Sequence, residues 1–397
     1  MMSTDFKVAN SLPTYVFQGI ADLKMAEIAK GHDVIDLSMG NPDGPLPDHV
    51  KKTITDSVNT PGSNGYCSSY GIMPLREAIC TWYKGYYGVD LDPNSETVVC
   101  IGSKEGFSTL AKAAVNPGDK IVVPTPYFPI HRQDFVLVGA EVLHMSLPFG
   151  EGFFLKEAEF LAELEELVKA KKPQYVLLNF PHNPTSIVAT QAFYEKAVEM
   201  AKKYEFYIIS DMAYGALGFD GWKVPSILSV KGAKNVAVEA YTLSKTYNMA
   251  GLRVGFMSGN KDLVGAIKKL KTWLDYGMHE SIQRGAVAAL LGDQSCVQDN
   301  IDRYQRRRDY MSKAFKDAGW DIGKNSAGMF IWAKLPEQKM HMDSKEFFED
   351  LLFKAHIAVT PGLSFGKGGE KYVRVALLVD EARVDEAARR IKEYLKS

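Results

Sequence analysis

The sequence has no long uninterrupted apolar run and no strong bias of charge. No stretch reaches the about 18 consecutive apolar residues that a membrane-spanning helix needs, so we expect no transmembrane helix. Lysine and arginine number 47 against 48 aspartate and glutamate, which gives a formal net charge of -1. Nucleic-acid-binding proteins and proteins of membrane surfaces usually carry a basic excess. We therefore predict neither a nucleic-acid partner nor a membrane partner.

Cysteine is scarce in this chain of 397 residues. The four cysteines are Cys67, Cys80, Cys100 and Cys296. They have neither the density of a disulfide scaffold nor the spacing of zinc ligands, so a small buried hydrophobe is the expected role of each. The opening residues, MMSTDFKVANSLP, lack the charged-then-apolar pattern of a signal peptide. These absences favour a reduced, cytoplasmic setting, and we expect no metal site.

Short β-rich runs alternate with amphipathic helical stretches such as EAEFLAELEELVKAKK and TQAFYEKAVEMAKKYE. The predicted strands are 96–102, 120–126, 174–180, 206–211, 236–243 and 253–259. Nearly continuous apolar strands spaced by helices are typical of a mostly parallel sheet that is covered on both faces. The predicted fold class is therefore α/β, with a doubly wound sheet in a large domain.

The C-terminal part of the chain has a different pattern. Its predicted strands and helices are 328–335, 344–355, 357–362, 372–379 and 382–395. This order indicates a smaller α+β domain, which the N-terminal segment would complete. We expect a large domain at 48–285 and a small domain at 1–47 plus 286–397, with a helix at 261–277 as a bridge between them.

Polar residues follow five of the predicted strands. In an open parallel sheet, ligands bind at the carboxyl ends of the strands. The residues expected at this edge are Ser103, Lys104, Tyr127, Asn183, Asp211, Tyr214, Ser244 and Lys245. Ser103 and Lys104 also begin a helix, whose N-terminal backbone N–H groups attract a phosphate.

Each of these residues has an ordinary alternative role. Asp211 could cap a helix, Asn183 before Pro184 could be a turn residue, and Tyr127 could pack in the core or at its rim. A single lysine such as Lys245 is usually solvated. Their shared position at strand ends instead favours one site.

The stretch AYTLSKTYNMAGLRVG, residues 240–255, concentrates charge and hydroxyl groups. Lys245 lies between small hydroxyl residues, and Arg253 follows it by eight positions. An amine, hydroxyls and a guanidinium in one strand-to-helix turn can converge on one anionic cofactor.

On these motifs the chain resembles the class I/II aminotransferases, pyridoxal-phosphate enzymes of fold type I. The matching segments, in the family's order, are GNPDGPLP, YCSSYGIMPLREAI, GSKEGF, PTPYFPIH, FPHNPTS, SDMAY, TLSKTYNMAGLRVGF and YVRVAL. The segments GSKEG, DGWKVPSI and TLSKTYNMAG look most similar to the branch of alanine (glutamate–pyruvate) and LL-diaminopimelate aminotransferases.

The resemblance implies a role for each residue at the sheet edge. Lys245 would form the Schiff base with pyridoxal 5'-phosphate and carry the proton between the substrate Cα and the cofactor. Asp211 would keep the pyridine nitrogen protonated, so that the ring acts as an electron sink. Tyr214 and Asn183 would bond the phenolic oxygen, and Tyr127 would stack on the ring. The residues implied around the phosphate are Ser103, Lys104, Thr242, Ser244 and Arg253.

The resemblance also implies substrate contacts and a shared site. Arg374 would grip the substrate α-carboxylate with its planar fork, although a surface-strand arginine is the alternative. Gly40 would let the backbone approach the substrate, and Tyr15 would line the entrance. Tyr127 and Asn183 would also contact the substrate. Tyr66 would reach the phosphate across a dimer interface, which requires a homodimer.

Two departures from the family pattern bear on this prediction. Ser186 replaces the usual glycine of the turn after Asn183, and we expect it to be tolerated. His279 and Glu280 introduce charge where relatives have less. They could face the neighbouring subunit's site, or they could belong to a solvated helix end.

We predict a transaminase that uses alanine/pyruvate with glutamate/2-oxoglutarate. Aspartate and LL-diaminopimelate are alternative substrates. No second arginine for a side-chain carboxylate is apparent, so the sequence does not decide whether the substrate is a dicarboxylate. A carbon–sulfur β-lyase shares the fold and the lysine. A DNA-binding regulator on this fold is disfavoured, since Gly40 comes too early to leave room for a DNA-binding module and Lys245 is intact.

Overall fold

The computed structural model describes residues 5–6, 10, 12 and 15–396, and the chain divides into two compact units. Unit 1 comprises Met1–Gly40, Arg307–Lys324 and Phe330–Ser397. Unit 2 comprises Asn41–Arg306 and Asn325–Met329. Each unit has its own sheet structure, so each is described by itself.

The described residues of unit 2 form a seven-stranded sheet in the order β2-β8-β7-β6-β5-β3-β4. The strands are β2 (Thr97–Cys100), β3 (Lys120–Thr125), β4 (Glu141–Ser146), β5 (Tyr175–Asn179), β6 (Tyr207–Asp211), β7 (Ala237–Thr242) and β8 (Gly255–Gly259). Pairs β3–β4, β3–β5, β5–β6 and β6–β7 are parallel, whereas β8 is antiparallel to both β2 and β7. The sheet is therefore mostly parallel, with one reversed strand.

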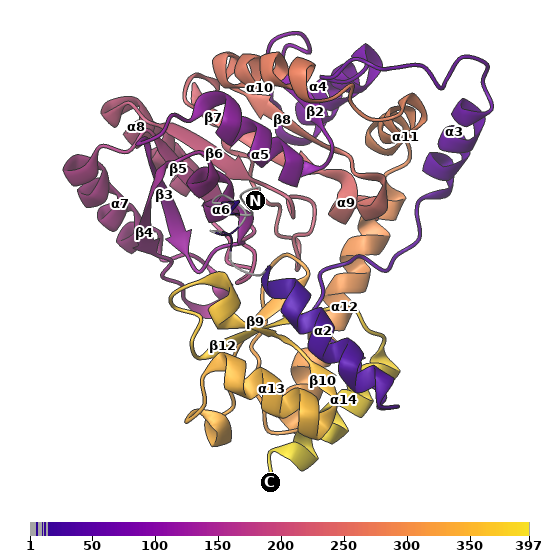
Figure 1. The fold of residues 1–397 in the computed structure, drawn as a ribbon, viewed down its shortest axis with the longest axis vertical. Coiled ribbons are helices and arrows are strands. Elements are labelled where there is room, and N and C mark those ends of the chain that lie inside the picture. The colour runs from indigo at the N-terminus through magenta and orange to yellow at the C-terminus, as the bar shows by residue number, and fades with distance from the viewer. Residues whose placement is uncertain (1–4, 7–9, 11, 13–14, 397) are drawn as a thin grey trace. The chain divides into compact units, whose positions relative to one another are not determined.

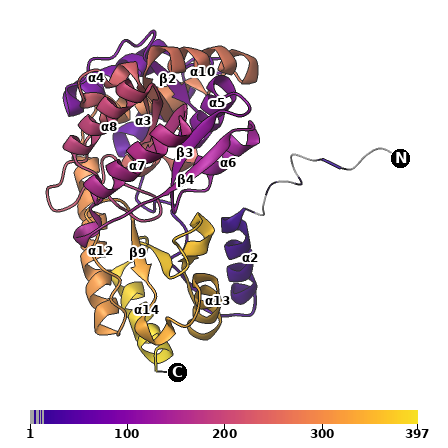
Figure 2. The same ribbon diagram turned by 90° about the vertical axis from the view of Figure 1, so that its left-hand side faces the viewer.

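Helices cover both faces of this sheet (Figure 1; Figure 2). Those of unit 2 include α3 (Asp48–Val58), α4 (Met73–Tyr87), α5 (Ser103–Ala114), α6 (Ile130–Leu137), α7 (Glu157–Lys171), α8 (Gln191–Tyr204), α9 (Leu243–Thr246), α10 (Lys261–Leu274) and α11 (Glu280–Leu291). Short 3-10 turns occur at Glu151–Phe153, Ile227–Ser229, Ala233–Asn235 and Ala250–Leu252.

The apolar strands pack against helices on each side because every second residue points to the same face. One core cluster joins Val98, Val123 and Ile209 of the strands to residues of α5, α6 and α10. On the opposite face, the ring of Trp82 in α4 lies 4.7 Å from that of Tyr241 in β7. The predicted α/β, doubly wound architecture is confirmed. The prediction missed β4, an edge strand whose side chains are largely exposed or half-buried.

Unit 1 is a smaller α+β body. Its described part contains a three-stranded antiparallel sheet, in the order β11-β12-β9, and a parallel pair, β1-β10. Its elements are α2 (Val16–Ala29), β1 (Ile35–Asp36), β9 (Phe330–Lys334), a 3-10 turn (Glu337–Lys339), α13 (Ser344–Ala355), β10 (Ile357–Ala358), β11 (Thr360–Pro361), a 3-10 turn (Gly362–Phe365), β12 (Tyr372–Ala376) and α14 (Glu381–Tyr394). The pairing of Ile35 with Ile357 places the N-terminal segment in this unit.

The boundaries of the units differ from the predicted ones. Helix α12 (Ser295–Asp317) contains the change from unit 2 to unit 1, between Arg306 and Arg307. Helix α10, which was expected to be the bridge, lies wholly within unit 2. Helix α11 packs against α3 and α4, and this packing keeps the chain beyond residue 285 in unit 2.

Across the described residues, no helix combines the length and the apolar character that crossing a membrane requires.

Candidate functional site

The carboxyl ends of five strands meet at one edge of the sheet in unit 2. Strands β3, β5, β6 and β7 pair in this order, and each pair is parallel. Strand β2 runs in the same direction, because both β2 and β7 are antiparallel to β8. The register places Asn179 opposite Asp211, and Asp211 opposite Ala240. The geometry therefore confirms the common edge that the sequence predicted.

Asp211 ends β6 and is buried, with a carboxylate that contacts defined partners on both oxygens. Its Oδ2 lies 2.8 Å from Nε2 of His131, which is fully buried. Its Oδ1 accepts a hydrogen bond of 3.0 Å from the backbone N–H of Ala213. These contacts fix the orientation of the carboxylate before any ligand binds.

His131 was not among the predicted site residues, although it lies within the motif PTPYFPIH. The predicted residues directly follow strands, whereas His131 lies on α6, beyond the loop that follows β3. The sequence signal that could have found it is a histidine four positions after Tyr127, inside a motif already assigned to the site.

Asn179 is a second residue that the sequence analysis missed. It is the last residue of β5, and its Nδ2 donates to the carbonyl oxygen of Asp211 over 3.0 Å. Its Oδ1 accepts a 3.0 Å hydrogen bond from the backbone N–H of Asn183. The side chain of Asn179 thus ties the loop of Asn183 to the end of β6. Tyr214, three residues after Asp211, is buried in the turn that follows this strand.

Lys245 lies in the one-turn helix α9, directly after β7. The hydroxyl of Thr242 accepts from the backbone N–H of Ser244 over 3.2 Å and lies 2.9 Å from the Ser244 hydroxyl. The backbone carbonyl of Lys245 accepts a 2.8 Å hydrogen bond from Nδ2 of Asn300. Lys245 is half-buried. Its turn is therefore fixed by two hydrogen bonds to the backbone, one from the N–H of Ser244 and one to the carbonyl of Lys245.

Arg253 lies between the 3-10 turn Ala250–Leu252 and strand β8, in the left-handed backbone region with φ +59. Its Nη1 donates to the carbonyl of Ala250 over 2.8 Å. A Cβ added to Gly102 would lie 2.4 Å from Nη2 of Arg253, and one added to Gly255 would lie 2.5 Å from the backbone nitrogen of Ser103. The two glycines therefore let the guanidinium and the start of α5 approach each other closely.

This glycine-lined cradle fits a phosphate group. It combines an exposed guanidinium, the hydroxyls of Thr242 and Ser244 and the N-terminal backbone N–H groups of α5, which begins at Ser103. Lys104, the second residue of α5, is exposed.

Tyr127 follows β3 and stacks against His144 of β4, with ring centroids 5.4 Å apart and planes inclined by 10°. Partial burial raises the pKa of the Tyr127 hydroxyl, and the charge of Arg132 opposes that rise. The ring is thus held from the β4 side in a defined plane.

Glu239 of β7 is another buried carboxylate of this sheet, opposite Ser210 in the register. Burial raises its pKa from 4.5 to about 7, although several hydrogen bonds favour the ionised form. The donors are the hydroxyls of Tyr83, Ser226 and Ser210 and the backbone N–H of Ile227.

Unit 1 contains the remaining predicted substrate residues. Arg374 of β12 is only 2% exposed, and its Nη2 donates to the carbonyl of Ser38 over 2.9 Å. The guanidinium carbon lies 4.0 Å from the ring centre of Phe330, 5.0 Å from that of Phe365 and 5.1 Å from that of Phe17. The alternative of a surface-strand arginine is therefore wrong.

Gly40 is adjacent to this aromatic enclosure. A Cβ at Gly40 would lie 2.6 Å from the ring of Phe330, so a larger residue would displace the ring that covers Arg374. Tyr15 is 44% exposed. Partial burial raises the pKa of its hydroxyl, and the charge of Arg374 opposes that rise.

Three further residues singled out in the sequence lie elsewhere in unit 2. Tyr66 is 90% exposed, and its ring centre lies 4.6 Å from that of Tyr276. His279 caps α11 by accepting from the backbone N–H of Ser281, and Glu280 pairs with Arg284. In this chain the two residues therefore form an ordered helix start.

Ser186 adopts φ +57 and is buried, with its backbone N–H bonded to the carbonyl of His182 over 2.7 Å. The left-handed conformation explains why glycine is usual at this position. The chain accommodates serine here with a hydrogen-bonded turn.

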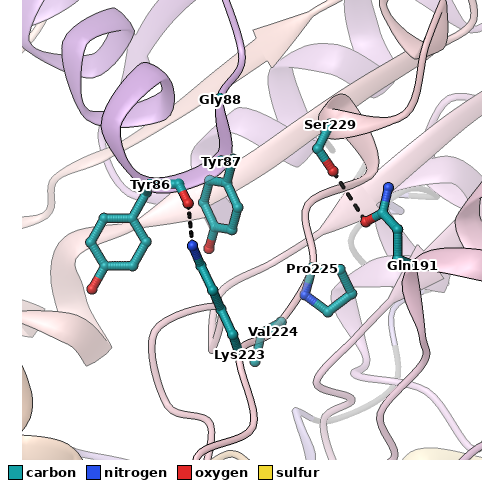
Figure 3. Close-up of a pocket in the computed structure, with 8 residues that line it drawn as sticks. All are labelled: Tyr86, Tyr87, Gly88, Gln191, Lys223, Val224, Pro225 and Ser229. Carbon is teal, nitrogen blue, oxygen red and sulfur yellow. Dashed lines mark hydrogen bonds between the residues drawn. The ribbon is translucent and has the colours of Figure 1, made fainter.

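A separate cavity of about 430 Å³ lies in unit 2 and contains none of the predicted site residues (Figure 3). Its lining residues are Tyr86, Tyr87, Gly88, Gln191, Lys223, Val224, Pro225 and Ser229. The amine of Lys223 donates to the backbone carbonyl of Tyr86 over 2.5 Å. The lysine amine among these lining residues is thus bonded to the backbone, and neither Asp211 nor Lys245 of the sheet edge lines the cavity.

Known proteins match this chain over nearly its whole length. A family model described as aminotransferase class I and II matches residues 32–391. The glutamate-pyruvate aminotransferase AlaC of Escherichia coli (strain K12) is 44% identical over 394 residues, covering 99% of this chain and 94% of that protein. The LL-diaminopimelate aminotransferase of Halothermothrix orenii is 36% identical and covers 96% of both.

A solved structure gives the same result. The substrate-bound BacF structure from Bacillus subtilis matches with a TM-score of 0.90 at 34% identity, covering 99% of this chain and 98% of that one. The matches agree with the branch to which the sequence motifs pointed. The chain therefore belongs to the class I and II aminotransferases, as a transaminase that depends on pyridoxal phosphate.

Proposed function

We propose that this transaminase exchanges the amino group between alanine/pyruvate and glutamate/2-oxoglutarate. The support is the 44% identity to a glutamate-pyruvate aminotransferase over almost the whole chain. Aspartate and LL-diaminopimelate remain the alternative donors, and the second of these is favoured by the relative of that name at 36% identity.

We propose that Lys245, Asp211 and Tyr214 are the catalytic residues. The cofactor, when bound, supplies a conjugated ring that accepts electrons from the substrate Cα. The amine of Lys245 attaches the cofactor and moves the proton at that carbon. Asp211 holds a proton on the ring nitrogen. The observation that carries this assignment is the buried carboxylate of Asp211, oriented by His131 and by the backbone of Ala213.

We propose that the glycine-lined cradle binds the cofactor phosphate. Arg253 supplies charge, Thr242 and Ser244 supply hydroxyls, and Ser103 and Lys104 supply the helix start. Tyr127 stacks on the ring, while Tyr214 and Asn183 bond its phenolic oxygen. The Asn179 side chain supports this last contact by fixing the backbone of Asn183.

We propose that Arg374 binds the substrate α-carboxylate. A guanidinium flanked by aromatic rings is desolvated, and a desolvated fork binds a carboxylate strongly in a bidentate manner. Gly40 has no side chain, so its backbone can approach the substrate closely. Tyr15 lines the substrate entrance. We also propose that Tyr127 and Asn183 contact the substrate.

We propose that the active form is a homodimer in which Tyr66 serves the partner's phosphate site. Its 90% exposed ring and the exposed Trp273 and Tyr276 offer a large apolar surface on unit 2. A mixture of Lys245→Ala and Tyr66→Ala chains tests this proposal. If sites are shared, mixed dimers regain activity that neither variant has alone, and the absence of any recovery would count against sharing.

We propose a cytoplasmic location, where thiols stay reduced. The support is that all four cysteines are present as thiols rather than disulfides.

The substrate proposal is tested by stopped-flow mixing of the holoenzyme with single amino acids. Conversion of the bound cofactor to its aminated form is followed by absorbance. Alanine and glutamate should convert it rapidly. If neither does so while aspartate or LL-diaminopimelate does, the alanine/glutamate assignment is wrong. Release of pyruvate and ammonia from cysteine-type substrates without an oxoacid would instead indicate a carbon–sulfur β-lyase.

A further inference from the structure

A cluster of two histidines and one glutamate lies in unit 1. Glu27 is near the end of α2, His32 follows that helix, and His356 ends α13. One ligand atom from each side chain lies within 4.8 Å of the other two. In the part of the chain that the structure describes, no other group of three potential metal ligands comes as close together.

The two carboxylate oxygens of Glu27 have different neighbours. Oε1 accepts a hydrogen bond from the ammonium of Lys30 over 2.6 Å. Oε2 lies 2.7 Å from Nδ1 of His32 and 3.9 Å from Nδ1 of His356. The carboxylate is almost completely buried, at 3% side-chain exposure. One oxygen and two imidazole nitrogens therefore face a common point, and the lysine bonds the other oxygen.

His356 presents a nitrogen that the fold leaves unsatisfied. Its Nδ1 is buried and makes no hydrogen bond to any residue that the structure describes. Its backbone is fixed, because its N–H donates to the carbonyl of Leu352 and its own carbonyl accepts from the N–H of Ile35. A buried polar atom without a hydrogen bond is unfavourable, and a ligand at this point would satisfy it.

We propose that Glu27, His32 and His356 bind one divalent transition-metal ion of the zinc class. Two imidazole nitrogens and a carboxylate oxygen suit such ions, whereas magnesium and calcium prefer oxygen ligands alone. This proposal departs from the expectation of no metal site, which considered cysteine spacing only.

The ligands must move closer together to hold the ion. Two atoms that are each about 2 Å from one tetrahedral ion lie about 3.3 Å apart, so a separation of up to 4.8 Å must shrink by up to about 1.5 Å. The rings of His32 and His356 stack at 4.1 Å with planes inclined by 28°. The ring of His32 is 40% exposed, which gives it room to turn toward the ion. Binding displaces the proton between His32 and Glu27.

The ion can reach the cluster from solvent. His356 lines a groove of about 610 Å³ between the end of α13 and helix α14. The guanidinium of Arg390, which also lines this groove, pairs with Asp33 at 2.7 Å and with Glu386 at 2.6 Å. Water from this groove can complete the coordination.

A bound ion would join two segments that flank the same strand pair. His32 precedes β1, and His356 directly precedes β10. Strands β1 and β10 pair with each other. The ion would therefore hold the N-terminal segment to the end of α13 and stabilise unit 1 in proportion to its occupancy.

The test is a titration of the untagged, metal-stripped holoenzyme with Co²⁺, without amino acids, followed by visible absorbance. We expect one equivalent to bind with ligand-field bands of a nitrogen and oxygen site and without a thiolate charge-transfer band. Zn²⁺ should displace the Co²⁺, whereas Mg²⁺ should not. Because no turnover is measured, failure of this proposal is separate from failure of the transaminase assignment.

Two ligand variants and one control decide the assignment. His32→Ala and His356→Asn should each weaken binding by at least about tenfold. Asparagine is chosen at position 356 because it tolerates the φ of +52 there. His341→Ala removes an exposed histidine elsewhere and should leave the affinity unchanged. Absence of saturable binding in the wild-type protein, or equal affinity in His32→Ala, would overturn the proposal.

Discussion

The sheet edge of unit 2 and the arginine enclosure of unit 1 hold their functional groups by different physical means. In unit 2, the Asp211 carboxylate is held by hydrogen bonds to His131 of helix α6 and to the backbone N–H of Ala213 in the turn after β6. In unit 1, Arg374 is surrounded by aromatic rings and makes a hydrogen bond to the Ser38 carbonyl. The first arrangement fixes a group by direction, whereas the second fixes it chiefly by shape.

This difference teaches which substitutions each region should tolerate. A hydrogen-bonded group loses its role when the chemistry of its partner changes, even at constant volume. A group enclosed by rings loses its role when the shape of the side chain changes, even at constant charge. The following predictions test this contrast, from the largest effect to the smallest.

Lys245→Ala should abolish the reaction chemistry of unit 2. We expect turnover to fall by at least about 10⁴-fold, because a residue that acts as both attachment point and proton carrier has no substitute. Turnover is measured with alanine and 2-oxoglutarate. Lys169→Ala, at an exposed lysine of α7 outside the proposed site, serves as the control and should keep most of the activity. Turnover above about one hundredth of wild type in Lys245→Ala would contradict the assignment.

Arg374→Lys keeps the charge in unit 1 but changes the shape. We expect kcat/KM to fall by about 100-fold, mainly through KM, since an ammonium cannot form the paired contacts of the guanidinium fork. Cofactor affinity should stay constant. Arg389→Lys, in an exposed pair with Glu386, controls for the substitution itself. An unchanged KM in Arg374→Lys would show that this arginine does not hold the substrate.

His131→Phe keeps a ring of similar size in unit 2 but removes the hydrogen bond to Asp211. We expect kcat to fall by about tenfold, because the bond to a charged carboxylate is lost. His131→Gln, which can still donate, should recover part of the loss. Equal kcat values in the two variants would mean that His131 acts through packing alone.

Glu239→Gln should alter the pH dependence of stability rather than catalysis. Burial raises the carboxyl pKa from 4.5 to about 7, so the folded state favours the protonated form. The stability that this proton provides is complete below about pH 4.5 and is lost as the pH rises to about 7. One pKa unit corresponds to about 1.4 kcal/mol, so the loss is on the order of 3 kcal/mol.

The measurement is urea unfolding of wild type and Glu239→Gln between pH 4.5 and 7, the window set by the pKa shift. The wild-type free energy of unfolding should fall across this window relative to that of the variant. Parallel curves for the two proteins would show that Glu239 remains ionised in the folded state.

The sequence predicted the architecture well where one local pattern decides the outcome. The apolar strands and the polar residues that follow them identified the edge that carries Asp211 and Lys245. Edge strand β4 was missed because its outward side chains weaken the apolar pattern. His131 was missed because it reaches Asp211 from a helix, and only the packing of α6 on the sheet brings the two side chains together. The site roles themselves remain predictions.

The unit boundary was also out of reach of local patterns. Helices α10 and α12 both have the length of a bridge, and the choice between them depends on which neighbours they pack against. Likewise, Glu27 and His356 are 329 positions apart, so no spacing rule could have joined them.

The antiparallel direction of β8 relative to β7 brings the two ends of the segment between these strands close together. Thr242 pairs with Gly255 across the β7–β8 ladder, so the segment that bears Lys245 and the segment that bears Arg253 leave the sheet from adjacent points. The distance between the Lys245 amine and the Arg253 guanidinium therefore depends on the pairing of β7 with β8 more than on the rest of the domain. If Lys245 and Arg253 hold the two ends of the cofactor as proposed, this one ladder sets how far apart those ends must lie.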